Sequence, residues 1–178
     1  VERSRGLGDV YKRQGERIRS GGSREGESDY MPKTVSVHNG SAANREHNRR
    51  NPRTTGQMPH IQQDLVHTNE TWIDIPVREA YKQIFQTAVD DYNRRQSRPE
   101  RKIRDYYNQI RKSAKKRTAY ELIIQIGDKN DTGLSVDNEI ACLREYYNNW
   151  QQRNPNLFLC GAYLHRDEST VHLHMDYI

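Results

Sequence analysis

Cysteine is scarce in this chain, which contains only two in 178 residues, Cys142 and Cys160. They lie far apart in the sequence, so it offers neither a CxxC pair nor a disulfide framework. Long apolar runs are also missing: none approaches the roughly eighteen residues that would span a membrane, and no signal-peptide core is present. We therefore expect a protein of the reducing cytoplasm with no membrane segment.

Apolar residues are few as well, at 33% of the chain. This fraction is low for a compact domain and indicates that part of the chain lies outside the core. The length suits one domain. In contrast, basic residues are in excess: 29 Lys and Arg against 24 Asp and Glu give a formal charge of +5, and the sequence pI is near 9.2. This balance favours a polyanionic partner.

Residues 1–30 differ in composition from the rest of the chain. They have no hydrophobic periodicity and are crowded with Arg, Gly, Ser and Glu, so they cannot bury enough apolar surface to become ordered. Residues 9–14 also resemble the translation of a transposon-end sequencing adapter. We expect a disordered or artefactual leader, with a basic nucleic-acid-binding arm as the alternative. Residues 31–178 form the domain, expected to be incomplete at its C-terminus because a strand pattern is still running there.

The remaining sequence mixes strand and helix signals. Apolar runs and alternation predict strands at 34–37, 71–75, 120–126, 157–164 and 171–177. Three- and four-residue spacing predicts helices at 76–95, at 97–117 with a Ser97–Glu100 capping box, and from a Ser135 cap to about 154. Residues 38–69 form a long polar segment, loop or irregular. The pattern predicts an α+β fold, an antiparallel sheet with helices packed on one face.

The last predicted strand carries two histidines. Apolar and polar residues alternate along 171–177, which places His172 and His174 on the same face. In the hairpin register that sets His165 opposite His172, Glu168 lies in the turn above them, whereas a one-residue slip would turn His165 away. These four side chains could then converge on one divalent metal. The alternative is that His172 and His174 form only the solvent face of an edge strand.

Two motifs resemble those of the Mob/Pre plasmid mobilisation and recombination proteins, relaxases of the HUH superfamily. The run His-Arg-Asp-Glu-Ser-Thr-Val-His-Leu-His at 165–174 resembles the metal motif of this family, with Val171 where proline is usual. Far upstream, His47-Asn48-Arg49-Arg50 resembles the His-Asn-x-Arg of the family, and His67-Thr68-Asn69 resembles a His-x-Asn stretch that follows it. The resemblance covers about residues 31–178 and implies a C-terminally truncated catalytic domain with an HUH relaxase-like fold.

The resemblance implies a DNA strand transferase. Mn²⁺ or Mg²⁺ would be held by His165, Glu168, His172 and His174; on the residues alone zinc, which accepts three histidines, stays open. His47 would attack a phosphorus of single-stranded origin-of-transfer DNA, leaving a 3′-hydroxyl and a covalent 5′-phosphate adduct, and Arg50 would bind the phosphate. The partner would be single-stranded or supercoiled plasmid DNA, and any dimer would form through the missing C-terminal part.

Alternatives remain for the nucleophile and for the function. Tyrosines could replace His47: Tyr106-Tyr107 and Tyr146-Tyr147 lie in predicted helices, and Tyr177 lies on the apolar face of the histidine strand. A tyrosine nucleophile would favour a rolling-circle replication initiator nuclease. The other classes are a non-catalytic DNA-binding protein and a zinc hydrolase acting on small substrates, the latter disfavoured by the basic charge.

Two basic groups are candidates for contact with DNA. Arg45, Arg49 and Arg53 lie beside His47 in the sequence. Residues 99–117 hold eight Lys or Arg against two acids. The candidates in this stretch for sequence-independent phosphate contact are Arg111, Lys112, Lys115 and Lys116. A solvated helix face is the alternative for most of these side chains, and His38 and His60 are interpreted as solvated loop histidines.

Overall fold

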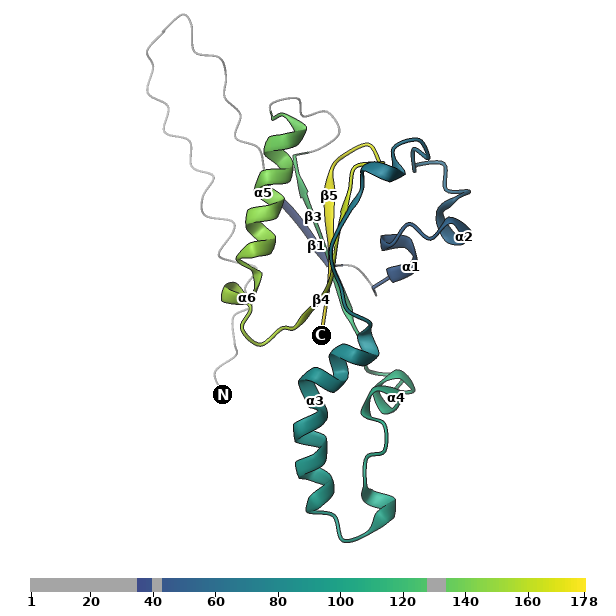
Figure 1. The fold of residues 1–178 in the computed structure, drawn as a ribbon, viewed down its shortest axis with the longest axis vertical. Helices are drawn as coiled ribbons and strands as arrows, with labels where there is room; N and C mark the ends of the chain where they lie inside the picture. Colours follow the sequence, from purple (N-terminus) through teal and green to yellow (C-terminus); the bar gives the residue numbers. More distant parts are fainter. Residues whose placement is uncertain (1–34, 40–42, 128–133) are drawn as a thin grey trace, which may run out of the picture. The chain divides into compact units, whose positions relative to one another are not determined.

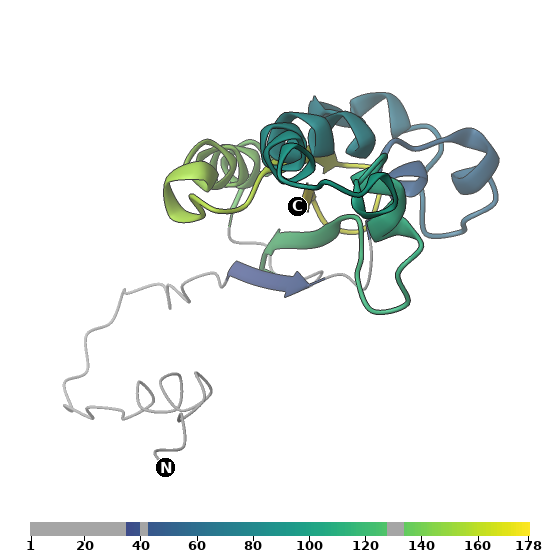
Figure 2. The ribbon, with the colours of Figure 1, turned by 90° about the horizontal axis from the view of Figure 1, so that it is seen from below.

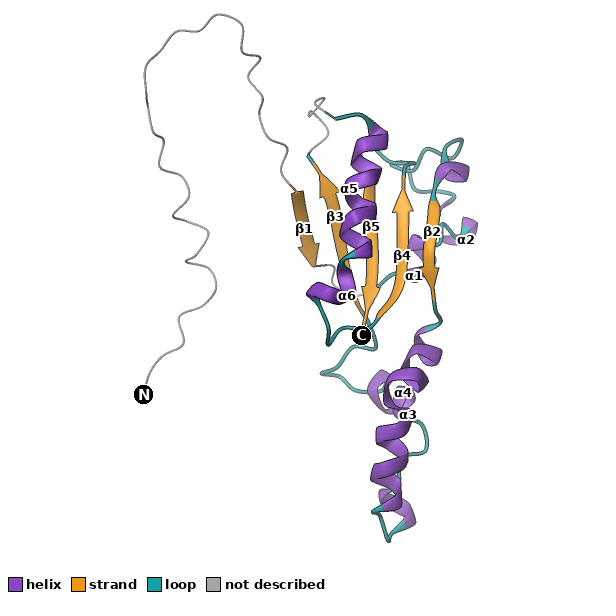
Figure 3. Cartoon of the chain, turned by 60° about the vertical axis from the view of Figure 1, so that its left-hand side comes forward, coloured by secondary structure: helices purple, strands orange, loops and turns teal. Residues whose placement is uncertain are grey.

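The histidine-bearing strands lie inside a five-stranded sheet that is antiparallel throughout (Figures 1 and 3). The computed structural model describes residues 35–39, 43–127 and 134–178, all within the unit Lys33–Ile178; the leader expected at 1–30 lies outside them. The strand order is β1-β3-β5-β4-β2. The bounds are β1 Val35–Asn39, β2 Glu70–Asp74, β3 Tyr120–Ile126, β4 Leu159–His165 and β5 His172–Tyr177. Each overlaps a predicted strand, and the α+β class is confirmed.

The register of the β4–β5 hairpin decides which side chains share a face. It pairs His165 with His172, as the sequence predicts. β5 lies between β3 and β4 rather than at an edge, and His172 and His174 are buried. The interpretation of these two histidines as the solvent face of an edge strand is therefore wrong.

The two faces of the sheet are covered by different segments (Figures 1 and 2). α5 (Val136–Asn148), capped by Ser135 as predicted, and α6 (Trp150–Arg153) cover the apolar face. The core there contains Ile124, Leu143, Trp150, Leu164, Leu173 and Met175. The polar face meets α1 (Arg45–Asn48), with α2 (Pro52–Thr55) beside it. These two short helices and η3 (Val66–Thr68) belong to the segment predicted as loop or irregular.

α3 (Val77–Arg94), predicted to begin after Pro76, extends with α4 (Tyr106–Arg111) beyond one end of the sheet (Figure 1). Aromatic rings join them: the ring centroids of Phe85 and Tyr106 lie 5.1 Å apart, and those of Tyr81 and Tyr107 lie 5.4 Å apart. In the part of the chain that the structure describes, no helix combines the length and the apolar character needed to cross a membrane.

The predicted helix over 97–117 is wrong except at α4. η4 (Pro99–Arg101) is a single 3₁₀ turn. Ile103 is then held by the side chain of Asn93, which accepts from its N–H (2.8 Å) and donates to its carbonyl (2.9 Å). Asp105 adopts an extended conformation and caps α4 by accepting from Asn108 N (2.9 Å). These side-chain bonds compete with a continuous helix for the same backbone groups.

Candidate active site

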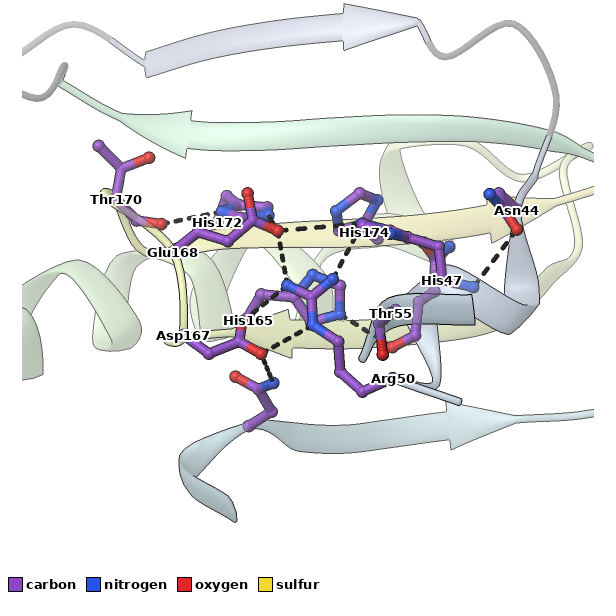
Figure 4. A network of polar contacts seen from close by, with 12 residues as sticks. Asn44, His47, Arg50, Thr55, His165, Asp167, Glu168, Thr170, His172 and His174 are labelled. Atoms are coloured by element: carbon purple, nitrogen blue, oxygen red, sulfur yellow. Dashed lines mark hydrogen bonds and ion pairs between the residues drawn. The ribbon is translucent and has the colours of Figure 1, made fainter. Parts of the chain in front are cut away.

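Three histidines meet on the polar face of the β4–β5 hairpin (Figure 4). His165 ends β4, and His172 and His174 alternate along β5, so the three rings lie on the same side of the sheet. Their centroids are 4.6 to 5.2 Å apart, and the residues are 0%, 7% and 5% exposed. The structure therefore gathers the three predicted imidazoles into one buried cluster.

Each imidazole of this cluster has one nitrogen fixed by a protein oxygen. The pairs are His165 Nε2 with the Asn48 carbonyl (2.8 Å), His172 Nδ1 with the Thr170 carbonyl (2.9 Å), and His174 Nδ1 with the Glu121 carboxylate (2.9 Å). These oxygens accept, so the histidine nitrogens donate, and in the neutral form of each ring the other nitrogen carries a lone pair. Among the described residues, His165 Nδ1 and His174 Nε2 are buried without a hydrogen-bond partner. Imidazoles oriented in this way are typical of metal ligands.

Burial favours the neutral form of His165 and His172, which is the form that binds a cation. Burial lowers the pKa of His165 well below its ordinary value, with repulsion from His174 and Arg50 adding to the effect, and burial is also the main cause of the lowered pKa of His172. For Glu121, burial alone would raise the pKa, but the hydrogen bonds from His174 and Asn48 outweigh burial. The pKa is therefore below its ordinary value, and the carboxylate is ionised. Neutral imidazoles beside an ionised carboxylate are the forms that bind metal.

We expect the metal-free protein to lose stability as the pH falls below about 6.5, the unfolded pKa of histidine. His165 and His172 have lowered pKa values when folded, so below this pH the unfolded chain binds more protons. Their contribution is therefore complete above the unfolded pKa and is lost below it, by about 1.4 kcal/mol per pH unit for each histidine that stays neutral. Thermal unfolding in EDTA across this window measures the slope, and a flat profile would contradict the argument.

Two overlapping groups of described residues could hold a metal ion. One is His165, Glu168 and His172, and the other is His47, His165 and His174; within each group the ligand atoms lie within 4.8 Å of one another. Glu168 lies in the β4–β5 turn with its Oε1 3.8 Å from His172 Nε2. Of the four predicted ligands, His165 belongs to both groups, Glu168 and His172 belong to the first, and His174 belongs to the second. The sequence did not indicate that His47 lies within ligand distance as well.

His47 faces the cluster from α1, and its ring centroid lies 5.8 Å from that of His174 and 5.9 Å from that of His165. Its Nε2 lies 2.9 Å from Arg50 Nη1. A guanidinium only donates, so His47 Nε2 must carry a lone pair. Burial, followed by the positive charge of Arg50, lowers the pKa of His47. This side chain is 17% exposed, so an unprotonated nitrogen is presented at the edge of the site.

Arg50 is fixed by two carboxylates. Its Nε and Nη2 donate to Asp167 at 2.8 and 2.7 Å, and Nη2 also donates to Glu168 at 2.6 Å. Asp167 accepts a further bond from Asn69 Nδ2 (2.7 Å), which links the His67-Thr68-Asn69 stretch to the site. Arg50 has φ 52°, in the left-handed region. Such strain costs about 1–3 kcal/mol and is concentrated at functional sites.

The predicted DNA-contact residues fall into two classes. Arg45 and Arg49 both pair with Asp74 on β2, and the hydrogen bond from Arg49 is the main cause of the Asp74 pKa of about 2. Arg45 also donates to the Ile75 and Cys160 carbonyls, so this pair of arginines attaches α1 to the sheet. Arg49 is exposed although it pairs with Asp74, and the exposed members that lie outside this contact are Arg53, Arg111, Lys112, Lys115 and Lys116.

A hollow of about 480 Å³ is lined by residues of both basic groups. Its wall includes residues 43–46, at the start of α1, and residues 116–119, which follow α4. The basic residues among the lining are Arg45, Arg111, Lys116 and Arg117. The structure therefore places part of the second basic group beside the helix that carries His47.

The tyrosines considered as nucleophiles make other contacts. Tyr177 packs against Trp150 in the core, Tyr147 packs against Trp72, and Tyr106, the first residue of α4, packs against Phe85 of α3. Tyr163 shares the polar face of β4, but its hydroxyl donates to Asp74 (2.8 Å), and burial raises its pKa well above the ordinary value of a tyrosine. A hydroxyl that resists deprotonation is a poor nucleophile.

Sequence reasoning left three positions around the site unassigned. Glu121 orients His174, Asn48 orients His165, and Asp167 holds Arg50. A carboxylate within the apolar run 120–126 and an aspartate inside the 165–174 motif were the available signals. His60, interpreted as solvated, is exposed, with its ring centroid 6.3 Å from that of His47.

Comparisons with known proteins give one family and one group of structures. The family model described as plasmid recombination enzyme (Mob_Pre) matches residues 38–178. A Mn-bound MobM relaxase domain (MOBV; Mob_Pre) with plasmid pMV158 oriT DNA, at pH 5.5, is 19% identical and has a TM-score of 0.49, covering 83% of this chain and 70% of that chain. Two further Mn-bound structures, at pH 4.6 and with a 3′-thiophosphate at pH 6.8, are 19% and 21% identical, with a TM-score of 0.43 each, covering 82% of this chain and 70% and 69% of those chains. No curated protein matches.

Proposed function

The chain belongs to the family of plasmid recombination enzymes (Mob_Pre), and we propose that it is a mobilisation relaxase that nicks single-stranded DNA at an origin of transfer and stays attached to the 5′-phosphate. One observation carries the proposal: His47 Nε2 has a lone pair and faces the buried cluster of His165, His172 and His174. A nucleophile beside a site for positive charge is what transesterification at phosphorus requires.

The donor set fits a divalent metal ion. His165 belongs to both groups of possible ligands, with His172 and the Glu168 carboxylate in one and His174 in the other. Among the described residues, His165 Nδ1 and His174 Nε2 are buried without a hydrogen-bond partner. The Glu168 carboxylate suits Mn²⁺ or Mg²⁺, the ions of phosphoryl transfer, whereas three imidazoles would hold zinc as well. When bound, the ion would supply positive charge that polarises the scissile phosphate.

His47 acts as the nucleophile in this proposal. Its Nε2 lone pair forms the bond to phosphorus while the bond from phosphorus to the 3′-oxygen breaks. The leaving oxygen takes up one proton and becomes a 3′-hydroxyl. The ring carries a positive charge once Nε2 is phosphorylated and releases its Nδ1 proton, so charge and protons balance. The bond energy is retained in the adduct, which allows the strand to be rejoined.

Arg50 binds the phosphate beside His47. Nη1 is the part of its guanidinium that points at His47 Nε2, while Asp167 and Glu168 hold the other nitrogens. When a phosphate approaches His47, Nη1 can donate to a phosphate oxygen and free the lone pair for attack. The fixed planar fork suits this task because little side-chain entropy remains to be lost.

The exposed cations extend the site into a path for DNA. Lys112, Lys115 and Lys116 follow α4, and the hollow between residues 43–46 and 116–119 connects this stretch to α1. Lysine and arginine side chains in such positions bind phosphates without reading bases. We assign Arg53 and Arg111 to the same path, whereas Arg45 and Arg49 position α1.

His47 has a second candidate role. It belongs to one of the two metal-ligand groups, together with His165 and His174. As a ligand, its lone pair would face the ion and be lost for attack, and another side chain would have to form the adduct. The protein would then be similar to a replication initiator that uses a tyrosine.

Capture of covalent adducts from a mixture of DNA sequences tests the proposal and identifies the cleaved site in the same experiment. The full chain is incubated with Mn²⁺ and a randomised single-stranded oligonucleotide library, denatured, and separated from unattached DNA. We expect a denaturation-resistant adduct whose sequenced DNA defines one cleaved site and whose phosphopeptide, by mass spectrometry, contains His47. An adduct on a tyrosine would favour the replication-initiator alternative, and DNA binding without any adduct would favour a non-catalytic DNA-binding protein.

A further inference from the structure

The helix that presents His47 has four residues, Arg45–Asn48, and cannot be stable by itself. Its position is therefore set by contacts with the sheet. At its first residue, Arg45 donates to Asp74 and to the carbonyls of Ile75 and Cys160. These contacts anchor one end of the helix, while His47 is the third residue and lies near the other end.

Asn48 provides the anchor at that other end. It is 2% exposed, and its Nδ2 donates to Glu121 Oε1 (2.8 Å) and to Asp176 Oδ1 (3.3 Å). Its backbone carbonyl accepts from His165 Nε2 (2.8 Å). One buried residue thus joins α1 to β3, β4 and β5.

The same contacts orient two of the proposed metal ligands. His165 is held directly by the Asn48 carbonyl, and His174 is held by the Glu121 oxygen that also accepts from Asn48 Nδ2. The orientation of both rings in the proposed metal site therefore depends on the position of Asn48. Since Asn48 follows His47 in the chain, the position of the nucleophile depends on it too.

We propose that Asn48 is a positioning residue that couples the metal centre to the nucleophile. A bound metal would fix the rings of His165 and His174. The Asn48 carbonyl and the Glu121 carboxylate, which accept hydrogen bonds from these rings, would then be fixed as well, and through Asn48 so would α1 with His47. This inference rests on the proposed function and extends it, because it gives the metal a role in ordering the nucleophile besides its effect on the phosphate.

The chemistry of an amide explains the residue type. Asn48 Nδ2 points at two buried carboxylates, Glu121 and Asp176, which need donors. An aspartate here would add a third negative charge, and an apolar residue would leave both carboxylates short of a hydrogen bond. Loss of a group that orients a metal ligand typically lowers metal affinity about 10–100-fold.

Two measurements that do not require DNA test the coupling. Mn²⁺ affinity is followed by electron paramagnetic resonance, and amide hydrogen exchange is followed in the peptide that contains α1, where Asn48 N and Arg49 N donate to the Asn44 and Arg45 carbonyls. In the unmodified chain we expect Mn²⁺ to slow exchange in α1. In Asn48→Ala we expect about 10–100-fold weaker Mn²⁺ binding and, at saturating Mn²⁺, no slowing in α1. Asn148→Ala, an exposed position on α5, is the matched control and should behave like the unmodified chain.

The possible outcomes separate the two proposals. Mn²⁺ binding and slowed exchange that persist in Asn48→Ala would overturn the coupling and leave the proposed function intact. An unmodified chain that binds no Mn²⁺ would remove both. If Asn48→Ala does not fold, Glu121→Gln serves as the second variant. It keeps the size and shape of the side chain that connects Asn48 to His174 but removes its negative charge. We then expect about tenfold weaker Mn²⁺ binding with folding retained, and unchanged affinity would overturn the inference.

Discussion

His47→Ala is expected to abolish the covalent protein–DNA adduct and to slow strand cleavage by roughly 10⁴–10⁶-fold, the usual effect of removing the nucleophile from a covalent mechanism. The neighbouring imidazoles cannot substitute, since the lone pairs of His165 and His174 are buried inside the cluster while His47 is 17% exposed. Single-turnover cleavage of the DNA recovered by adduct capture measures the rate, and a denaturing gel measures the adduct.

The matched control is His38→Ala, at an exposed position on β1, which should cleave and attach at the unmodified rate. DNA binding by His47→Ala should stay close to that of the unmodified chain, because the exposed cations that we assign to phosphate contact are unchanged. A normal adduct in His47→Ala would show that the attacking atom belongs to another residue. Tyr163 would be the first tyrosine to replace, since it shares the polar face of the sheet.

The histidine hairpin could be predicted from the sequence because its information is local. Alternation along 171–177 assigns His172 and His174 to one face, and the short turn restricts the register so that His165 faces His172. Helix α5 was likewise predictable, since Ser135 caps it and a periodic apolar face follows. The structure of the β4–β5 hairpin and of α5 is thus determined by residues within about twenty positions of one another in the sequence.

The contacts that complete the site could not be predicted, because they join distant residues through side chains. Glu121 and Asn48 are 73 positions apart, and Arg50 and Asp167 are 117 apart. Alternation places Glu121 on the polar face but gives no partner for it. The error at 97–117 has the same origin: the bonds between the Asn93 side chain and the backbone of Ile103 replace helical bonds, and local propensity does not report them.

The double variant His172→Ala/His174→Ala is expected to lose metal binding and DNA cleavage together. Each metal-ligand group found in the described residues contains one of these two histidines, so both groups fall below three ligands. We expect Mn²⁺ affinity to fall by more than the roughly 100-fold that loss of an orienting partner can cost. At free Mn²⁺ of about 100 times its dissociation constant, the unmodified protein gains about 2.7 kcal/mol, a rise in Tm of roughly 5–10 °C for a domain of this size. The double variant should show no rise.

Comparison with His47→Ala then distinguishes the two roles considered for His47, metal ligand and nucleophile. If His47 attacks the phosphate, His47→Ala binds Mn²⁺ with unchanged affinity and loses only the adduct, whereas the double variant loses both. If His47 is a ligand, both variants bind Mn²⁺ weakly and the adduct forms on another residue. The unmodified chain in EDTA provides the internal control, because it keeps every side chain and should regain cleavage when Mn²⁺ is restored. Full cleavage by the double variant, or by the unmodified chain in EDTA, would contradict a metal centre at the β4–β5 hairpin.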